Sequence, residues 1–411
     1  MVDILLSYER MNLHSSYPYW LLRHGIVNSY PSLDRDVKTE VAVVGAGISG
    51  SLIAWHLCRA GFKVIIVDRR HAGMGSTAAN TSLLQYELDV PLHKLINKIG
   101  EKNAVKSYLL CREAIYKLEN ICHELNDPAV FARKPSFQFA SFKKDEPAIR
   151  KEYELRKKIG LDIRLLEKKE IDEKFGIRKN MGLLSADAAE ADAYKITHLL
   201  LFKCIGEGAL VYDHTEVSDI HHYKKGVKLL TSSGKKIIAN KLVIACGYES
   251  QRYVTKKIEQ LNSTFAIASE PLNKKKFWYK NSLIWETSIP YLYMRTTGDN
   301  RIIVGGKDIA GSDPVKRDAL LVYKSRTLEK AFKKLFPTID FKTDFRWAGT
   351  FATTADGLPV IGSMPERSDT YFALGSGGNG TTFSVVAAEI IRDMLLSKKN
   401  TDAGIFSFKR L

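Results

Sequence analysis

The sequence predicts an α/β protein in which a doubly wound sheet is interrupted by an α+β domain with an antiparallel sheet. Three observations favour this architecture. A buried strand, a glycine turn, a helix and a second buried strand follow one another over residues 41–68, as at the start of a doubly wound sheet. Apolar strand patterns return near the C-terminus, together with a glycine-rich loop at 375–380. Between these parts, hairpin-like strand patterns run from 263 to 310.

The individual elements follow from hydrophobic periodicity. Residues 41–46 and 63–68 are predicted as buried strands, with a helix over 48–60 between them. Apolar positions at helical spacing, beginning with Leu92 and Leu95, predict a long helical region over 92–126. The other predicted strands are 137–142, 181–190, 209–217, 226–232, 236–247, 282–288, 291–297, 301–308 and 370–375, and the other predicted helices are 144–174, 194–207, 321–335 and 381–396.

The domain boundaries are predicted from where the two kinds of strand pattern lie along the chain. An N-terminal extension without clear periodicity precedes the first sheet, and within it Trp20 to Leu22 are expected to form a short helix against the main body. The predicted ranges are 1–38 for the extension, 39–90, 191–262 and 340–411 for the discontinuous first domain, and 91–190 and 263–339 for the inserted domain with its helices.

Composition limits the classes of protein to which the chain can belong. The 411 residues contain no apolar run of 18 residues, so a membrane-spanning helix is not expected. The first 14 residues show no basic segment followed by an apolar one, so we expect no secretory signal and a cytoplasmic protein. Five scattered cysteines form no CxxC pair, which indicates neither a disulfide framework nor a zinc site.

The net charge of +16 comes largely from lysine clusters such as 274–276. The simplest interpretation is a solvated surface that attracts anionic ligands. Nucleic acid or an anionic membrane is the second interpretation. No RNA-binding module or arginine-rich arm is evident in the sequence, which argues against nucleic acid as the partner.

The glycine turn has the spacing of a dinucleotide site. Gly45 permits a tight turn, Gly47 allows close approach of a pyrophosphate, and Gly50 allows close packing of helix and strand. The start of the following helix offers free N–H groups to phosphates. Asp68 ends the next strand, where a carboxylate can accept hydrogen bonds from ribose hydroxyls. These residues predict dinucleotide binding, and Asp68 followed by two arginines is compatible with FAD or NAD.

Five motifs in a fixed order resemble the D-amino-acid oxidase superfamily of flavoproteins, which includes glycine oxidase and sarcosine oxidase. The resemblance spans roughly residues 38–400. The motifs are GAGISG at 45–50, DRR with GST at 68–77, LVIACGYES at 242–250, DGLPVIG at 356–362 and GSGGNGTTFS at 375–384.

The resemblance implies FAD, a Rossmann-like FAD-binding domain and a separate substrate domain. It places the glycine turn and the 245–247 segment along the pyrophosphate, Asp68 at the ribose, Val217 at the adenine, and the 377–381 segment beside the flavin at a helix N-terminus. The cofactor-binding residues that it implies are Gly45, Ala46, Gly47, Ile48, Ser49, Gly50, Asp68, Arg69, Arg70, Gly75, Ser76, Thr77, Val217, Ala245, Cys246, Gly247, Gly377, Gly378, Asn379, Gly380 and Thr381.

Departures from the family pattern are as informative as the matches. Gly349 stands where sarcosine oxidases carry the cysteine that bonds to the flavin, so FAD is expected to be non-covalent. Phe351, Gln85 and Thr382 stand where relatives carry an Arg or a Lys that grips the substrate carboxylate. A small free amino acid is therefore a poor candidate substrate. Arg295, with Lys307 nearby, could anchor a carboxylate from another direction.

The predicted pocket is mainly aromatic, and no metal site is expected. Its candidate residues are Gln85, Trp285, Tyr291, Tyr293, Arg295, Trp347, Phe351 and Thr382, and Tyr248 is expected to cover part of the cofactor.

The resemblance implies an FAD-dependent oxidoreductase that acts on the C–N bond of an amine or amino-acid-like small molecule. A hydride would pass from the carbon to flavin N5, and water would hydrolyse the resulting imine. This route requires no protein base, so the protein supplies orientation and electrostatics. Oxygen or another acceptor would reoxidise the flavin. Two alternatives stay open: a tRNA base-modifying flavoenzyme, and a flavin-binding protein without turnover.

Overall fold

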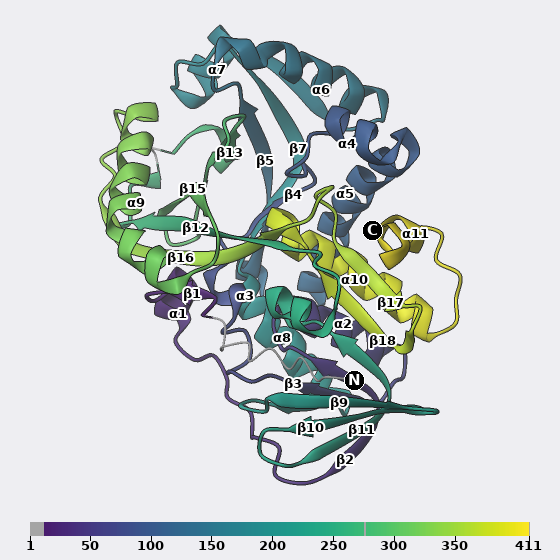
Figure 1. Cartoon of the computed structure of the whole chain (residues 1–411). Helices are drawn as coiled ribbons and strands as arrows, with labels where there is room; N and C mark the ends of the chain where they lie inside the picture. Colours follow the sequence, from purple (N-terminus) through teal and green to yellow (C-terminus); the bar gives the residue numbers. More distant parts are fainter. Residues whose placement is uncertain (1–11, 275–276, 411) are drawn as a thin grey trace.

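The computed structural model describes residues 12–274 and 277–410. Two sheets dominate the molecule, and Figure 1 shows the eight-stranded sheet in its lower part and the ten-stranded sheet in its upper part. The mixed α/β architecture confirms the predicted fold class. The first part of the predicted extension, and with it most of the segment in which no secretory signal was expected, lies outside the described residues.

The eight-stranded sheet has a parallel core, in the order β8, β3, β2, β11, β18. Val41 to Val44 and Val64 to Val67 are buried on both faces, as in a parallel sheet that is covered on each side. Antiparallel strands β17, β9 and β10 extend it. The strands are β2 Val37–Val44, β3 Val64–Val67, β8 Leu210–Tyr212, β9 Val217–Tyr223, β10 Gly226–Thr231, β11 Lys236–Ile244, β17 Val360–Met364 and β18 Arg367–Leu374.

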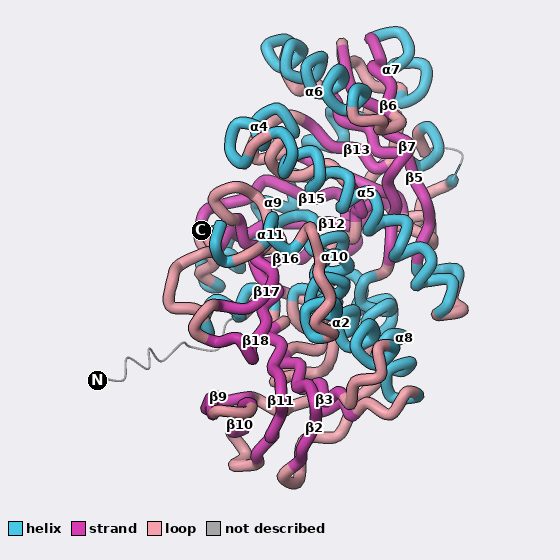
Figure 2. Tube along the Cα trace, turned by 90° about the vertical axis from the view of Figure 1, so that its right-hand side faces the viewer, coloured by secondary structure: helices cyan, strands magenta, loops and turns pink. Residues whose placement is uncertain are grey.

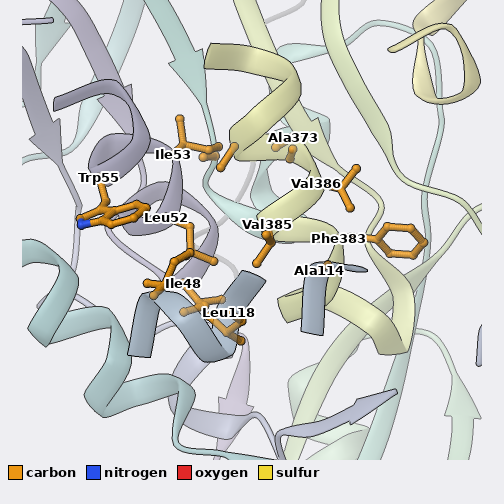
Figure 3. Packing of buried hydrophobic residues seen from close by; sticks show 14 of the residues in the cluster. Ile48, Leu52, Ile53, Trp55, Ala114, Leu118, Ala373, Phe383, Val385 and Val386 are labelled. Carbon is orange, nitrogen blue, oxygen red and sulfur yellow. The ribbon is translucent and has the colours of Figure 1, made fainter. Parts of the chain in front are cut away.

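Four helices cover one face of this sheet and share a hydrophobic core: α2 Ile48–Arg59, α5 Glu101–Glu124, α8 Ala193–Gly206 and α10 Gly380–Leu395. Figure 3 shows Leu52 and Ile53 of α2 near Val385 of α10, with Leu118 of α5 below them. Helix α2 begins at the glycine turn and helix α10 begins at the late glycine loop. Because both helices pack in this shared core, the packing fixes the positions of their N-termini. On the opposite face, side chains of the parallel strands pack against side chains of β9 and β10 and of the C-terminal segment.

The ten-stranded sheet is almost entirely antiparallel, and only the pairing of β13 with β5 is parallel. Helices α7 (Lys168–Phe175) and α9 (Pro314–Leu335) pack on it around Phe137 and Phe265, and Figure 2 shows α4 (Leu92–Ile99) and α6 (Glu146–Lys158) beside it. Its strands are β1 His14–Ser15, β4 Leu83–Gln85, β5 Phe131–Phe139, β6 Ile163–Glu167, β7 Met181–Ala191, β12 Gln260–Ser269, β13 Leu283–Glu286, β14 Leu292–Thr296, β15 Ile302–Ala310 and β16 Thr343–Thr353.

The strand pairing differs from the predicted division of the chain. Strands β4 and β16 lie within ranges predicted for the first domain, but they pair in the ten-stranded sheet. Helix α5, predicted in the inserted domain, packs against α10. The cause is that periodicity identifies an element but not its partner.

Two predicted helical regions are also interrupted. Gly100, with φ of 82°, separates α4 from α5, and strand β6 separates α6 from α7.

The described part of the N-terminal extension contacts the main body as expected. Helix α1 (Tyr19–His24) contains Trp20, which is buried against α3 (Ser76–Ala79) and the ten-stranded sheet. Strand β1 pairs with β16. Across residues 12–274 and 277–410, no helix has the length and apolar character needed to cross a membrane.

Candidate active site

A large cavity lies between the two sheets, and residues of both sheets line it. We call its two parts the glycine end and the aromatic end. The glycine end is formed by the 45–50 turn, Asp68 and the 245–247 segment. The aromatic end is formed by Trp285, Tyr291, Tyr293, Trp347 and Phe351.

The glycine turn is shaped by two close approaches of backbone. Gly45 has φ of 111°, and a Cβ on it would lie 2.5 Å from the carbonyl oxygen of Ala245. A Cβ on Gly50 would lie 1.8 Å from the carbonyl oxygen of Gly45. Helix α2 then begins after Gly47 without a side-chain cap, and Gly47, Ile48 and Ser49 line the cavity. This helix start can therefore receive an anion.

Asp68 closes the glycine end beside the turn. Its carboxylate accepts hydrogen bonds from the N–H groups of Ala46 at 2.8 Å and Arg70 at 2.9 Å. Burial raises the pKa of Asp68 to about 6, although these two N–H groups act in the opposite direction. Arg70 lines the cavity and forms an ion pair with Glu249 at 2.8 Å, and Arg69 pairs with the same carboxylate.

A smaller cavity continues beyond Asp68. Its lining includes Arg69 and Val217, and it shares Gly45, Asp68 and Cys246 with the large cavity. The two cavities therefore adjoin at these three residues, and together they outline an elongated path from Val217 past the glycine turn to the aromatic end.

The late glycine loop lines the cavity beside Asp89 and Tyr291 of the aromatic end. The 3₁₀ turn Gly377–Asn379 leads into α10, and the Asn379 amide donates hydrogen bonds to the carbonyls of Gln85 and Glu87, both at 3.0 Å. The N–H of Gly378 donates to Asp89 at 3.0 Å. These contacts hold residues 85–89 against the start of α10.

Most of the residues predicted to bind the cofactor line the large cavity. Ala46, Gly50 and Thr381 lie behind its surface, and Arg69 and Val217 belong to the smaller cavity. The predicted residues that line the large cavity are Gly45, Gly47, Ile48, Ser49, Asp68, Arg70, Gly75, Ser76, Thr77, Ala245, Cys246, Gly247, Gly377, Gly378, Asn379 and Gly380.

The aromatic end brings together all five predicted aromatic residues, with Gln85 and Tyr248. The ring centroids of Trp285 and Tyr291 lie 6.3 Å apart, and those of Tyr291 and Tyr293 lie 5.8 Å apart. Hydrogen bonds orient the rings: Tyr291 donates to Asp89 at 3.0 Å, and the Trp347 indole N–H donates to the carbonyl of Ala79, also at 3.0 Å.

Arg295 and Thr382 do not line the cavity, contrary to the prediction. Arg295 is 3% exposed, and its Nη1 donates to the carbonyls of Thr81, Ser82 and Ala191 at 2.8–3.1 Å. These three backbone acceptors hold the guanidinium away from the site. Thr382 is buried and donates to the carbonyl of Asn379 at 2.8 Å. Lys307 does not line the cavity either.

Sequence reasoning missed three carboxylates at the aromatic end: Glu87, Asp89 and Asp308. Oδ1 of Asp308 is buried without a hydrogen-bond partner, and burial raises the pKa of this carboxyl to about 6. Two glycines in a strand pattern, at 305–306, were an available signal, because glycine inside a strand often marks a bulge that redirects the next side chain.

The two ends of the cavity differ in their charged side chains, because the glycine end carries both Asp68 and Arg70. Among the described residues that line the large cavity, Arg70 is the only Arg or Lys, and it lies at the glycine end. The aromatic end carries the three carboxylates and no described Arg or Lys.

A family model for FAD-dependent oxidoreductases, named DAO, matches residues 40–394. The chain belongs to the DAO family. Gamma-glutamylputrescine oxidoreductase of Escherichia coli (strain K12) is 25% identical over 404 residues, which cover 89% of this chain and 85% of that protein. Glycine oxidase of Geobacillus kaustophilus (strain HTA426) is 23% identical over 391 residues, which cover 91% and 97%.

Solved structures show the same DAO-family fold. The structure of glycine oxidase from Geobacillus kaustophilus matches with a TM-score of 0.78 and 20% identity, over 91% of this chain and 99% of that one. L-proline dehydrogenase from P. horikoshii matches with a TM-score of 0.77 and 19% identity, over 90% and 97%.

The residues of this DAO-family protein fit FAD, the cofactor of the family. The path from Val217 to the aromatic end is elongated, as a dinucleotide requires. Backbone of the turn and of the 245–247 segment lines the cavity where the pyrophosphate is expected, and the lack of room for a Cβ on Gly45 shows that these two segments lie close together. The helix starts of α2 and α10 both face this path.

Proposed function

We propose that this DAO-family flavoenzyme oxidises a C–N bond of an amine that carries no free α-carboxylate. The observation that supports this proposal is the charge of the aromatic end, where Glu87, Asp89 and Asp308 are present without a described lysine or arginine. A substrate carboxylate would be repelled there, whereas a cationic amine would be attracted. Aromatic faces add to the attraction of a cation.

The family positions for a carboxylate anchor support the same conclusion. Phe351 lines the cavity and has no charge to offer. The Gln85 amide donates to the Ser136 hydroxyl at 3.0 Å and is held in that contact. Arg295 donates from Nη1 to three backbone carbonyls and lies 3.7 Å from Glu190, which holds it outside the cavity lining. A bidentate Arg–carboxylate contact therefore has no described residue to provide it at the aromatic end.

The roles of the chain's own residues follow from their positions. Gly45 to Ser49 would hold the pyrophosphate, Asp68 the ribose, and Gly377 to Gly380 the flavin. FAD supplies, when bound, the acceptor for the two electrons and the hydrogen that leave the carbon beside nitrogen. The rings of Trp285, Tyr291 and Tyr293 would exclude water and orient the amine, which is catalysis by positioning.

The bound FAD is proposed to be non-covalent. Gly349 occupies the position of the flavin-linking cysteine of sarcosine oxidases and lines the cavity. Cys246 is the one cysteine among the described lining residues, and it lies at the glycine end. Burial raises the pKa of the Cys246 thiol to about 12, so it is a poor nucleophile.

Anaerobic mixing of the FAD-loaded protein with small molecules tests the proposed substrate class. We expect primary or secondary amines without a carboxylate to bleach the flavin at least about 100-fold faster than glycine, sarcosine or D-alanine, because a buried unpaired charge is costly. Rapid bleaching by those three amino acids would overturn the substrate class. No bleaching by any amine would overturn the function. Readmission of oxygen then shows whether oxygen is the acceptor.

Acid precipitation tests the cofactor linkage in the same preparation. The yellow colour should pass entirely into the supernatant, and flavin that stays in the pellet would contradict non-covalent binding.

A further inference from the structure

Asp308 reaches the cavity through a bulge in β15. Thr264 of β12 faces two residues of β15 there, because the register shifts between the pairs Ser263–Ile309 and Phe265–Gly306. Gly306 and Lys307 have φ of 126° and 59° at this point. A bulge of this kind turns the following side chain away from the regular alternation. Asp308 consequently lines the aromatic end beside Thr264.

Two glycines make this arrangement sterically feasible. A Cβ on Gly305 would lie 2.3 Å from the hydroxyl oxygen of Tyr293, and a Cβ on Gly306 would lie 2.1 Å from the carbonyl oxygen of Tyr291. The ring of Tyr293 therefore lies over the strand next to Asp308. The bulge thus brings a carboxylate and an aromatic ring together in the same part of the cavity.

The Asp308 carboxylate is the least compensated of the three at the aromatic end. Asp89 accepts hydrogen bonds from Tyr291 and from the N–H of Gly378. Oε2 of Glu87 also lacks a hydrogen-bond partner, but Oε1 of Glu87 lies 3.9 Å from the buried guanidinium of Arg156. Oδ1 of Asp308 has no hydrogen-bond partner, and no described cation approaches this side chain within the 4.0 Å of an ion pair.

We propose that Asp308 binds the ammonium group of the substrate and accepts its proton before oxidation. This inference rests on the proposed amine oxidation, and it names the residue that recognises the positive charge of the substrate. One ammonium N–H bond breaks, the proton forms an O–H bond with Oδ1, and the nitrogen keeps the electron pair. The products are a neutral amine and a neutral carboxylic acid, with no change of oxidation state. The neutral amine is the form from which hydride can leave the adjacent carbon.

The surroundings of Asp308 suit a group that exchanges a proton. Burial raises its pKa to about 6, the Thr264 hydroxyl and the charges of Lys324 and Lys307 lower it, and the charge of Asp89 raises it further. Tyr291 and Tyr293 also face it, and their own pKa values are raised by burial and by its charge. Asp308 is therefore ionised at neutral pH and can still be protonated by a substrate.

Binding of a cation that cannot react tests the recognition step independently of turnover. The probe is choline, with 3,3-dimethylbutan-1-ol as its neutral isostere, and the readout is the perturbation of the flavin absorbance of the FAD-loaded protein. We expect choline to bind the wild type roughly tenfold more tightly than the alcohol, because its fixed positive charge is attracted by the carboxylate and the aromatic faces. This preference should weaken as pH falls through about 6. Equal affinities, or no choline binding, would overturn the proposal.

Substitution of the carboxylate identifies the residue responsible. Asp308→Asn should remove most of the preference for choline while FAD stays bound, since Glu87, Asp89 and the aromatic rings remain. Asp340→Asn is the matched control, because it removes the same charge from a side chain that is 70% exposed and should leave the preference unchanged. An undiminished preference in Asp308→Asn would overturn the proposal, and this result would leave the proposed amine oxidation intact.

The proton step has its own signature in an amine that bleaches the flavin. The wild-type rate at low substrate should rise with pH through about 6 and then level off. In Asp308→Asn the rate should rise about tenfold per pH unit until the pKa of the free amine is reached, because the variant can use only amine that is already unprotonated in solution. Asp308→Glu should restore a plateau. Identical pH profiles of the wild type and Asp308→Asn would refute the proton transfer.

Discussion

The glycine end of the cavity is formed largely by backbone, whereas the aromatic end is formed by side chains from strands that lie far apart in the sequence. At the glycine end, Gly45 and Gly50 are required because other backbone atoms occupy the space of their Cβ atoms. At the aromatic end, Tyr293 of β14 and Phe351 of β16 come from different strands of the ten-stranded sheet. The comparison teaches that a phosphate site can be encoded locally, while a substrate site depends on strand pairing.

The largest expected effect comes from filling the closest backbone approach at the glycine end. In Gly50→Ala the new Cβ would lie 1.8 Å from the carbonyl oxygen of Gly45. This clash is with a backbone atom, so a side-chain movement cannot relieve it. We expect the purified variant to be colourless, with FAD affinity reduced by about 100-fold or more, since the helix start that faces the pyrophosphate is displaced. Absorbance at the flavin band and titration with FAD measure this.

Gly206→Ala is the matched control for this prediction. It introduces the same methyl group at the end of α8, where nothing lies within 4 Å of the added Cβ. This variant should be yellow and bind FAD as the wild type does. A yellow Gly50→Ala protein with normal affinity would show that the glycine end does not depend on its backbone contacts.

The same contrast explains which parts could be predicted from the sequence. The glycine turn, Asp68 and the late glycine loop were recognisable because each is a short motif with a local physical cause. The placement of Arg295 was predicted wrongly, since its three carbonyl partners lie up to 214 residues away. Residues 340–411 were predicted for the FAD-binding domain, but β16 within this range pairs in the ten-stranded sheet, because a sequence pattern does not specify the partner of a strand. Asp308 was missed because a bulge determines its direction.

The second prediction concerns the wall behind the aromatic end. Arg156 is 1% exposed, donates to Glu152 from Nε at 2.8 Å, and lies 3.9 Å from Glu87, which lines the cavity. Arg156→Met would leave two buried carboxylates without their cation and should destabilise the protein by about 3–5 kcal/mol. Chemical denaturation of the FAD-free protein measures this change in stability. The control is Arg150→Met, at an exposed ion pair with Glu167, which should change stability by less than about 1 kcal/mol.

The pH dependence of unfolding provides an independent check on Arg156. Burial alone would raise the pKa of Glu152, but the charge of Arg156 and hydrogen bonds from His93 outweigh it and lower this pKa to about 2. Because the folded-state pKa lies below the ordinary value of 4.5, this carboxylate stabilises the wild type above pH 4.5, and the contribution is lost as pH falls toward 2. In Arg156→Met the decline in stability over this range should be smaller. An unchanged decline would assign it to other carboxylates.

The smallest effects should separate two tryptophans that hold adjacent carbonyls. Trp347 donates to the carbonyl of Ala79 at 3.0 Å and lines the cavity, whereas Trp20 donates to the carbonyl of Asn80 at 2.6 Å and does not line it. Replacement of either by Phe removes one buried hydrogen bond and should cost about 1–3 kcal/mol in stability. Thermal unfolding of both variants measures this.

Only Trp347→Phe should also alter the aromatic end, because the lost indole N–H leaves a ring that faces the cavity free to reorient. We expect the flavin spectrum and the affinity for choline to change in Trp347→Phe and to stay constant in Trp20→Phe. Equal changes in both variants would mean that the 79–80 segment, rather than the wall itself, controls the aromatic end. The shape of the aromatic end would then depend on local backbone as well as on side chains from distant strands. Arg295 holds the same segment, because it donates to the carbonyls of Thr81 and Ser82.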